Sequence, residues 1–137
     1  MTIEITIYGK PMAKERPRMT KTGHTYTPTK TLKYEKNVKD VFLKKYKDFE
    51  IYQGKMKATI KAVFEVPKSY SKKKKTMLLE TSNNYKHKPD CDNIAKIVLD
   101  SLNGLAYKDD SQITILEVIK EYGEQSKVIV KLESLEN

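Results

Sequence analysis

The sequence has 137 residues, enough for one domain around one hydrophobic core and too few for separate cofactor and substrate domains. Lysine and arginine outnumber aspartate and glutamate by 27 to 18, which gives a formal net charge of +9, and charged residues make up 33% of the chain. This composition, with no apolar run near the roughly 20 residues of a membrane span, excludes an integral membrane protein.

The N-terminal third is predicted to hold one strand, one irregular segment and one helix. Residues 2–8 alternate isoleucine with other side chains, as a half-buried strand does. Residues 10–28 contain three prolines, one glycine and many basic side chains without a period, which is typical of a functional or disordered loop. From about Thr29 to Tyr46, apolar residues recur at spacings that predict a helix.

The middle of the chain is predicted to contain a strand, a short helix and a polar connector. Residues 56–66 alternate almost perfectly between apolar and other side chains, so they predict a strand. Ser71 precedes four consecutive lysines and is a suitable N-cap for a short helix. Lysines in the first turn of a helix interact unfavourably with the positive end of the helix dipole, and a bound polyanion would offset this repulsion. Residues 83–91 form the connector.

A second long helix is predicted after this connector. Asp92 or Asn93 caps a helix that extends to about Asn103. Gly104 is the expected left-handed residue that stops it.

The C-terminal part is predicted to form two strands. After a short turn at residues 107–111, residues 112–121 and 127–133 alternate as strands do, with a hairpin turn at Gly123. The predicted fold is therefore a small α+β domain over residues 1–137, with a mostly antiparallel sheet packed against helices.

The compartment follows from two further features. Cys91 is the only cysteine, so it forms no internal disulfide and no thiolate metal site, which fits a reducing compartment. The first residues alternate and include an acid, unlike the basic and apolar start of a secretion signal. We therefore expect a cytoplasmic protein.

The positive charge is unevenly distributed. Residues 1–88 carry 22 basic and 8 acidic side chains, a balance of +14, whereas residues 89–137 carry 5 and 10, a balance of −5. Such a field favours a polyanionic partner, of which nucleic acid is the commonest, although a lysine-rich chain with solvated faces has the same composition.

Several acids of the C-terminal part have an unusual spacing. Asp90 and Asp92 lie where an extended segment enters the predicted helix, so their carboxylates can converge near its N-terminus. Lys96 follows Asp92 by four residues and Asp100 follows Lys96 by four, which places the three on one polar face.

Two more acids, Asp109 and Asp110, lie together on the predicted turn. Carboxylates held close together without a counter-ion raise the pKa of at least one of them, and a hard divalent cation removes that cost. Carboxylate and water ligands suit Mg²⁺ or Mn²⁺, and the lack of paired histidines and cysteines argues against zinc. In a chain that attracts phosphate, such an ion suggests phosphodiester hydrolysis, with Lys96 stabilising transition-state charge or orienting water. The same spacing is equally compatible with a helix cap, a surface ion pair and an ordinary turn.

A longer pattern resembles a known family. The run KPDCDNIAKIVLDSLNGLAYKDDSQI, from Lys88 to Ile113, resembles the signature of the RusA-like Holliday junction resolvases. It has an Asp-x-Asp-Asn opening, a lysine four residues after the second Asp, an Asp-x-Leu-Asn-Gly end and a Lys-Asp-Asp-x-Gln turn. The N-terminal part is similar as well, through Gly9, Lys10, Pro11, Lys14, Arg16, Arg18, Gly23 and Tyr26. The resemblance covers nearly the whole chain.

This resemblance implies a Mg²⁺-dependent endonuclease, with Mn²⁺ able to substitute and no small-molecule cofactor or membrane partner. It implies a homodimer that acts on branched DNA, the four-way junction, in recombination and repair, and such enzymes are often encoded by prophages. Carried over by position, the catalytic residues are Asp90, Asp92, Lys96 and Asp110. The three aspartates would bind the metal, with Asp109 as the substitute for Asp110.

The dimer also follows from the number of acidic clusters. A four-way junction is resolved by two symmetric cuts, and one chain offers one such cluster. Two chains related by a two-fold axis would supply both cuts.

Basic side chains outside this cluster are expected to bind DNA. Arg16 and Arg18 are the only arginines, and a guanidinium suits bidentate contact with phosphate. The lysines at 72–75 are expected to form a general backbone-binding patch, although a solvated face has the same pattern. The expected DNA-binding residues are Lys10, Lys14, Arg16, Arg18, Lys72, Lys73, Lys74, Lys75 and Lys88.

The aromatic residues divide into two sets. Tyr34, Phe42 and Phe64 are predicted to be core residues because they fall on apolar faces. Tyr26 and Tyr107 fall in predicted loops beside charged groups, where packing on DNA is one interpretation.

Two other functions stay open from the residues alone. A non-catalytic basic nucleic-acid-binding protein would use the acids only as caps and turns, and would bind with a steep salt dependence. A nuclease with the same chemistry would instead cut another branched or single-stranded DNA.

Overall fold

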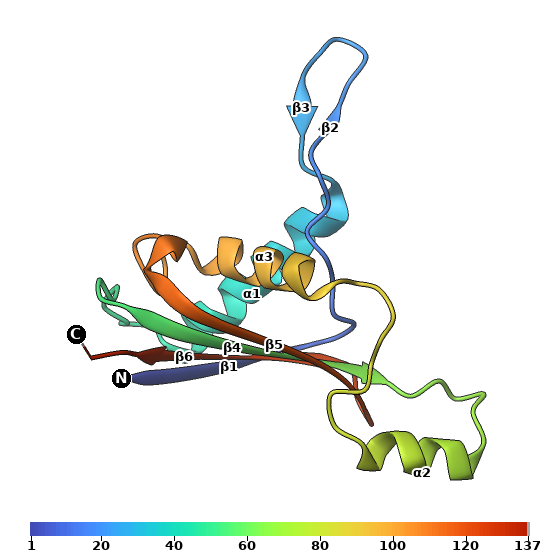
Figure 1. The fold of residues 1–137 in the computed structure, drawn as a ribbon. Helices are drawn as coiled ribbons and strands as arrows, with labels where there is room; N and C mark the ends of the chain where they lie inside the picture. Colours follow the sequence, from blue (N-terminus) through green and yellow to red (C-terminus); the bar gives the residue numbers. More distant parts are fainter. Residues whose placement is uncertain (137) are drawn as a thin grey trace.

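Two helices cover one face of a four-stranded sheet in the computed structural model, which describes residues 1–136 (Figure 1). The strands of the sheet are β1 (Thr2–Tyr8), β4 (Met56–Glu65), β5 (Ile113–Gly123) and β6 (Lys127–Ser134). The helices are α1 (Thr29–Lys45), α2 (Lys72–Glu80), α3 (Cys91–Leu102) and the short 3₁₀ helix η1 (Asp110–Gln112). The covering helices are α1 and α3, whereas α2 lies apart beyond one end of the sheet.

The strand order of the sheet is β1-β6-β4-β5. β6 pairs antiparallel with both β1 and β4, whereas β4 and β5 are parallel. The predicted α+β class is confirmed, and the sheet is mixed because one of its three pairings is parallel.

The core fills the space between the sheet and the two covering helices. Alternate residues of β1, β4 and β6 point into it, as the period of a strand requires. Tyr34, Phe42 and Phe64 are buried in it, which confirms the predicted core aromatics. Within residues 1–136, none of the helices has both the length and the apolar character needed to cross a lipid bilayer.

The predicted hairpin at Gly123 is wrong, because β4 lies between β5 and β6. The loop after Gly123 passes over the end of β4, where the backbone N–H of Val66 donates to the carbonyl of Gly123 at 3.1 Å and that of Glu65 donates to Oγ of Ser126 at 2.9 Å. A Cβ on Gly123 would lie 2.3 Å from Cγ1 of Val63, so only glycine fits there. Alternation shows which side chains share a face, but it does not show which strands are neighbours.

The start of α3 also differs from the prediction. Its N-cap is Asp90, with extended backbone at φ −73° and ψ 152°, rather than Asp92 or Asn93. The backbone N–H of Ile94 donates to the carbonyl of Asp90 at 3.1 Å, which closes the first turn. That turn precedes the first apolar residue of the helix, so the apolar period gives no signal for it.

The segment predicted to be irregular contains a short hairpin. Its strands are β2 (Arg18–Met19) and β3 (Thr25–Tyr26), which pair antiparallel. The hairpin, here called the arm (residues 18–26), projects away from the sheet and helices (Figure 1). Strands this short have no alternation that a sequence pattern could reveal.

Candidate active site

Two of the predicted site residues lie at the N-terminal end of α3. Asp90 is the N-cap, and its carboxylate lies 3.3 Å from Nζ of Lys88 on the exposed surface. Asp92 is exposed in the first turn. Acidic groups at this end are stabilised by the helix dipole, which explains why the helix tolerates both.

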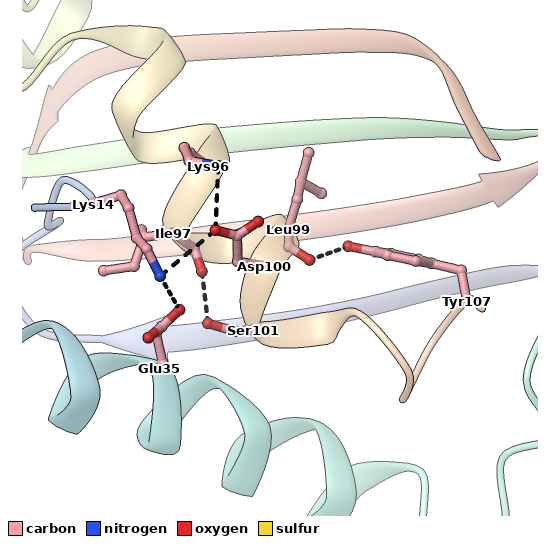
Figure 2. Close-up of polar contacts among 8 residues, drawn as sticks. All are labelled: Lys14, Glu35, Lys96, Ile97, Leu99, Asp100, Ser101 and Tyr107. Atoms are coloured by element: carbon pink, nitrogen blue, oxygen red, sulfur yellow. Dashed lines mark hydrogen bonds and ion pairs between the residues drawn. The ribbon is translucent and has the colours of Figure 1, made fainter. Parts of the chain in front are cut away.

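A chain of ion pairs ties α3 to α1 through the loop that follows β1 (Figure 2). Nζ of Lys96 lies 3.5 Å from Asp100, as the predicted polar face requires. Asp100 also lies 3.6 Å from Nζ of Lys14, which in turn donates to Glu35 at 2.8 Å. The side chains of Lys14, Glu35 and Asp100 are 20%, 14% and 26% exposed, so water screens these pairs only in part.

Lys14 therefore has a structural role that its position in the sequence did not reveal. Its ammonium is shared by two carboxylates, and its backbone N–H donates to the carbonyl of Asn93 at 3.2 Å. The DNA contact predicted for Lys14 stays a prediction, beside this role in holding the loop on α3.

Asp109 and Asp110 lie at the turn before β5 and differ in their contacts. Asp109 caps η1, where Oδ2 accepts from the backbone N–H of Ser111 at 3.1 Å. Gln112 completes a capping box by accepting from the backbone of Asp109 at 3.0 Å. The hydrogen bonds from Ser111 lower the pKa of the Asp109 carboxyl. Within residues 1–136 the exposed carboxylate of Asp110 makes no hydrogen bond or ion pair.

Tyr107 lies between this turn and α3. The ring is fully buried, and its hydroxyl donates to the carbonyl of Leu99 (Figure 2). Burial raises the pKa of Tyr107, and the carboxylates of Asp110, Asp100 and Asp109 raise it further, so the hydroxyl stays a donor. The interpretation that Tyr107 packs on DNA is therefore wrong, because a loop position in the sequence does not reveal burial.

The predicted ligands have suitable chemistry for Mg²⁺ but are not gathered at one point. Asp90 and Asp92 lie where the connector enters α3, and η1 lies beyond the other end of the helix (Figure 1). A helix of 12 residues is about 18 Å long, so α3 separates the two pairs of acids. No group of three or more His, Cys, Asp or Glu side chains in residues 1–136 is arranged to hold a metal ion.

Comparisons with known proteins identify the family of this chain. The family described as endodeoxyribonuclease RusA matches residues 8–133. The chain belongs to the RusA family. A curated relative, the uncharacterized protein YqaN of Bacillus subtilis (strain 168), is 38% identical over 135 residues, which cover 95% of this chain and 94% of that protein. The RusA match includes every residue of the acidic signature, and it confirms the resemblance.

Most of the residues expected to bind DNA are exposed, on several separate segments. Arg18 begins β2 in the arm and pairs with Glu15 at 3.3 Å. Nζ of Lys74 lies 3.9 Å from the centre of the Tyr70 ring. The others that lie exposed are Lys10, Arg16, Lys72, Lys73 and Lys88, whereas Lys14 and Lys75 are half-buried.

Sequence reasoning missed Lys120 in β5. Its ammonium donates to the carbonyls of His87 at 2.6 Å and Pro89 at 2.8 Å, so it anchors the connector that leads into Asp90. Lys120 pairs with the buried Ala62 in the sheet and therefore lies on the helix-covered face. A lysine at a core-facing position of an alternating strand was the available signal.

Proposed function

We propose that this RusA-family protein is a Mg²⁺-dependent endodeoxyribonuclease that resolves four-way DNA junctions by paired symmetric cuts in recombination and repair. The match to the RusA family over residues 8–133 carries the proposal. The acidic signature supplies the residue types that such chemistry needs, and the positive charge of residues 1–88 suits a DNA partner.

Asp90, Asp92 and Asp110 would hold the Mg²⁺ in a dimer, where Asp110 of one copy would meet Asp90 and Asp92 of the other, because α3 separates them within one chain. Mn²⁺ would substitute for Mg²⁺. Carboxylate oxygens are the ligands that these ions prefer. Asp110 is preferred to Asp109 because Asp109 is already used as a cap, whereas the Asp110 carboxylate is uncommitted within residues 1–136. When bound, the ion would polarise the phosphoryl oxygen and lower the pKa of a water molecule.

The protein's own cations would act on the phosphate. The side chain of Lys96 is 62% exposed and lies one turn after Asp92, so it can reach the charge that develops on the scissile phosphate. Asp100 orients Lys96, Lys14 holds Asp100, and Glu35 holds Lys14. These three residues would fix the position of the reactive lysine before DNA binds.

The DNA would follow the exposed cations. The arm carries Arg18, and Arg16 lies two residues before the arm. Lys72–Lys75 form the first turn of α2 at a separate place on the molecule (Figure 1). Contacts from such separated segments suit a substrate with several duplex branches. Two copies of the chain, each with one site, would make the two symmetric cuts. The free thiol of Cys91 suits a reducing compartment, so we place this activity in the cytoplasm.

The test is incubation of the purified protein with a synthetic four-way junction, a replication fork and a linear duplex, each with Mg²⁺, with Mn²⁺ and with a chelator. We expect cleavage of the junction with either ion and none with the chelator. Asp92→Asn should abolish cleavage and leave junction binding unchanged or tighter, because it removes a negative charge near the phosphates. Asp109→Asn is the matched control and should retain cleavage.

Three results would contradict parts of this proposal. Cleavage by Asp92→Asn at the wild-type rate would refute the metal assignment. Binding that falls steeply with salt, without any metal-dependent product, would indicate a non-catalytic DNA-binding protein. Preference for the fork would indicate a nuclease for other branched DNA. Because α3 separates the acids, mixing Asp92→Asn with Asp110→Asn would regain activity only if the two ligands come from different chains.

A further inference from the structure

A pocket lined by aromatic side chains lies where the connector before α3 meets the ends of β4 and β5. Its volume is about 440 Å³, and its lining includes Lys10, Phe64, Tyr70, Tyr85, His87 and Tyr122. A second pocket of about 270 Å³ shares Tyr70, His87 and Tyr122 and adds Lys74 and Lys86. Together they are here called the aromatic pocket, and their charged lining residues are Lys10, Lys74, Lys86 and one carboxylate, Glu65.

The rings of the aromatic pocket are held in place by one another. The ring of Tyr85 stacks on that of the buried Phe64, with centroids 3.6 Å apart and planes 3° from parallel. Tyr122 and His87 pack edge-on against Tyr85 at 5.0 Å and 5.4 Å. Tyr70, Tyr85 and Tyr122 line the same pocket, where burial raises the pKa of Tyr122 and the neighbouring hydroxyls of Tyr70 and Tyr85 raise it further.

This combination of groups suits a nucleobase. A volume of this size accommodates a small planar molecule. Aromatic side chains stack on bases with little regard to sequence, and phenol and imidazole groups can hydrogen-bond to base edges. The lysines at the edge, Lys10, Lys74 and Lys86, can neutralise the adjoining phosphates.

We propose that the aromatic pocket binds one unstacked base of the DNA strand that the protein holds. This inference rests on the proposed function only in its choice of branched DNA as the substrate. The pocket adjoins the candidate active site, since His87 lies in the connector that ends at Asp90. Lys120 fixes that connector and lies 5.6 Å from the centre of the Tyr85 ring. A base in the pocket would therefore place its strand beside the N-terminal end of α3.

The first test measures binding without metal, so that it does not depend on cleavage. The probe is fluorescein-labelled pentathymidylate, and fluorescence anisotropy gives the dissociation constant. We expect Tyr70→Ala to weaken binding about tenfold, the range of one lost stacking contact, and Tyr70→Phe to bind within about twofold of wild type. Tyr8→Ala is the matched control, because Tyr8 is 62% exposed on β1 and does not line the pocket. Equal binding by Tyr70→Ala and wild type would overturn the proposal.

The second test uses the wild-type protein and therefore does not depend on the folding of a variant. A four-way junction carries 2-aminopurine at one branch-point position at a time, and emission is measured as protein is added without metal. Neighbouring bases already quench 2-aminopurine in stacked DNA, so a base that leaves the stack for the pocket should change its emission, and we expect this change at one position only. No change at any position, or the same change at every position, would overturn the proposal. If pentathymidylate binds as expected but the junction is not cut with Mg²⁺, the proposed function fails and the pocket stands.

Discussion

Replacement of Lys14 by methionine tests whether this lysine holds the site together or only contacts DNA. The variant keeps most of the aliphatic side chain but removes the ammonium between Glu35 and Asp100. Two carboxylates that are 14% and 26% exposed then lose their shared counter-ion. We expect a lower free energy of unfolding and a misplaced Lys96, because Asp100 loses one of the contacts that fix it.

The magnitude follows from the distances and the exposure. At 2.8 Å and an effective dielectric constant of about 20, the Lys14–Glu35 pair has a Coulomb energy of about 6 kcal/mol before desolvation. Loss of one partner costs about 3 to 5 kcal/mol in a fully buried pair and about 0 to 1 kcal/mol at the surface. For these partly buried side chains we expect about 2 kcal/mol. In a chain of 137 residues, that corresponds to a melting temperature about 7 °C lower.

The assay is thermal and urea unfolding followed by circular dichroism, with junction binding measured on the same preparations. The double variant Lys14→Met/Glu35→Gln should recover part of the lost free energy of unfolding, because it also removes the Glu35 carboxylate that Lys14→Met leaves without its counter-ion. Lys10→Met is the control, because Lys10 is exposed and should affect DNA binding alone. Weakened DNA binding by Lys14→Met at an unchanged melting temperature would refute the structural role of the lysine.

Three further predictions concern other contacts. Burial raises the pKa of Tyr34 from 10.0 to about 12, and its buried hydroxyl has no hydrogen-bond partner within residues 1–136. Between pH 10 and 12 the unfolded chain loses this proton before the folded chain does, so the free energy of unfolding falls as the pH rises. Tyr34→Phe should make this fall smaller by up to about 2 kcal/mol, as measured from urea unfolding midpoints at each pH. Gly123→Ala should cost about 2 kcal/mol, because its Cβ would meet Val63 at 2.3 Å, and Val63→Ala in the same chain should recover part of it in the same measurement. Lys120→Met should lower the cleavage rate constant about tenfold and leave KM unchanged, because it releases the connector that presents Asp90; an equal change in both would contradict this positioning role.

Sequence patterns predicted the elements that have a long repeat. The helix from about Thr29 to Tyr46 and the strand at residues 56–66 were predicted to within about a residue, because a periodic buried face extends through each. The cap at Ser71 was confirmed, and its hydroxyl accepts from the backbone N–H of Lys74 at 3.2 Å. Gly104 was confirmed as the left-handed stop, with φ +82°.

The errors have a common physical origin in contacts between distant parts of the chain. Alternation at residues 112–121 and 127–133 is the same whether these strands pair with each other or with β4. The motif identified Asp90 and Asp110 as related residues, but the sequence pattern could not show that η1 lies beyond the far end of α3 rather than folding back beside Asp90. Likewise, the ion pairs of Lys14 depend on α1 and α3, which no local pattern reports.

The place of β6 in the sheet determines when the protein can fold during its synthesis. β6 follows every other strand in the chain, yet it lies between β1 and β4 and supplies two of the three strand pairings. β1 therefore has no partner strand until Lys127, which pairs with Tyr8, has left the ribosome. Pairings over such a separation form slowly, so the pairing edges of β1 and β4 stay open to chaperones until β6 has been synthesised. Loss of β6 alone would leave β4 and β5 as the one remaining pair of this sheet.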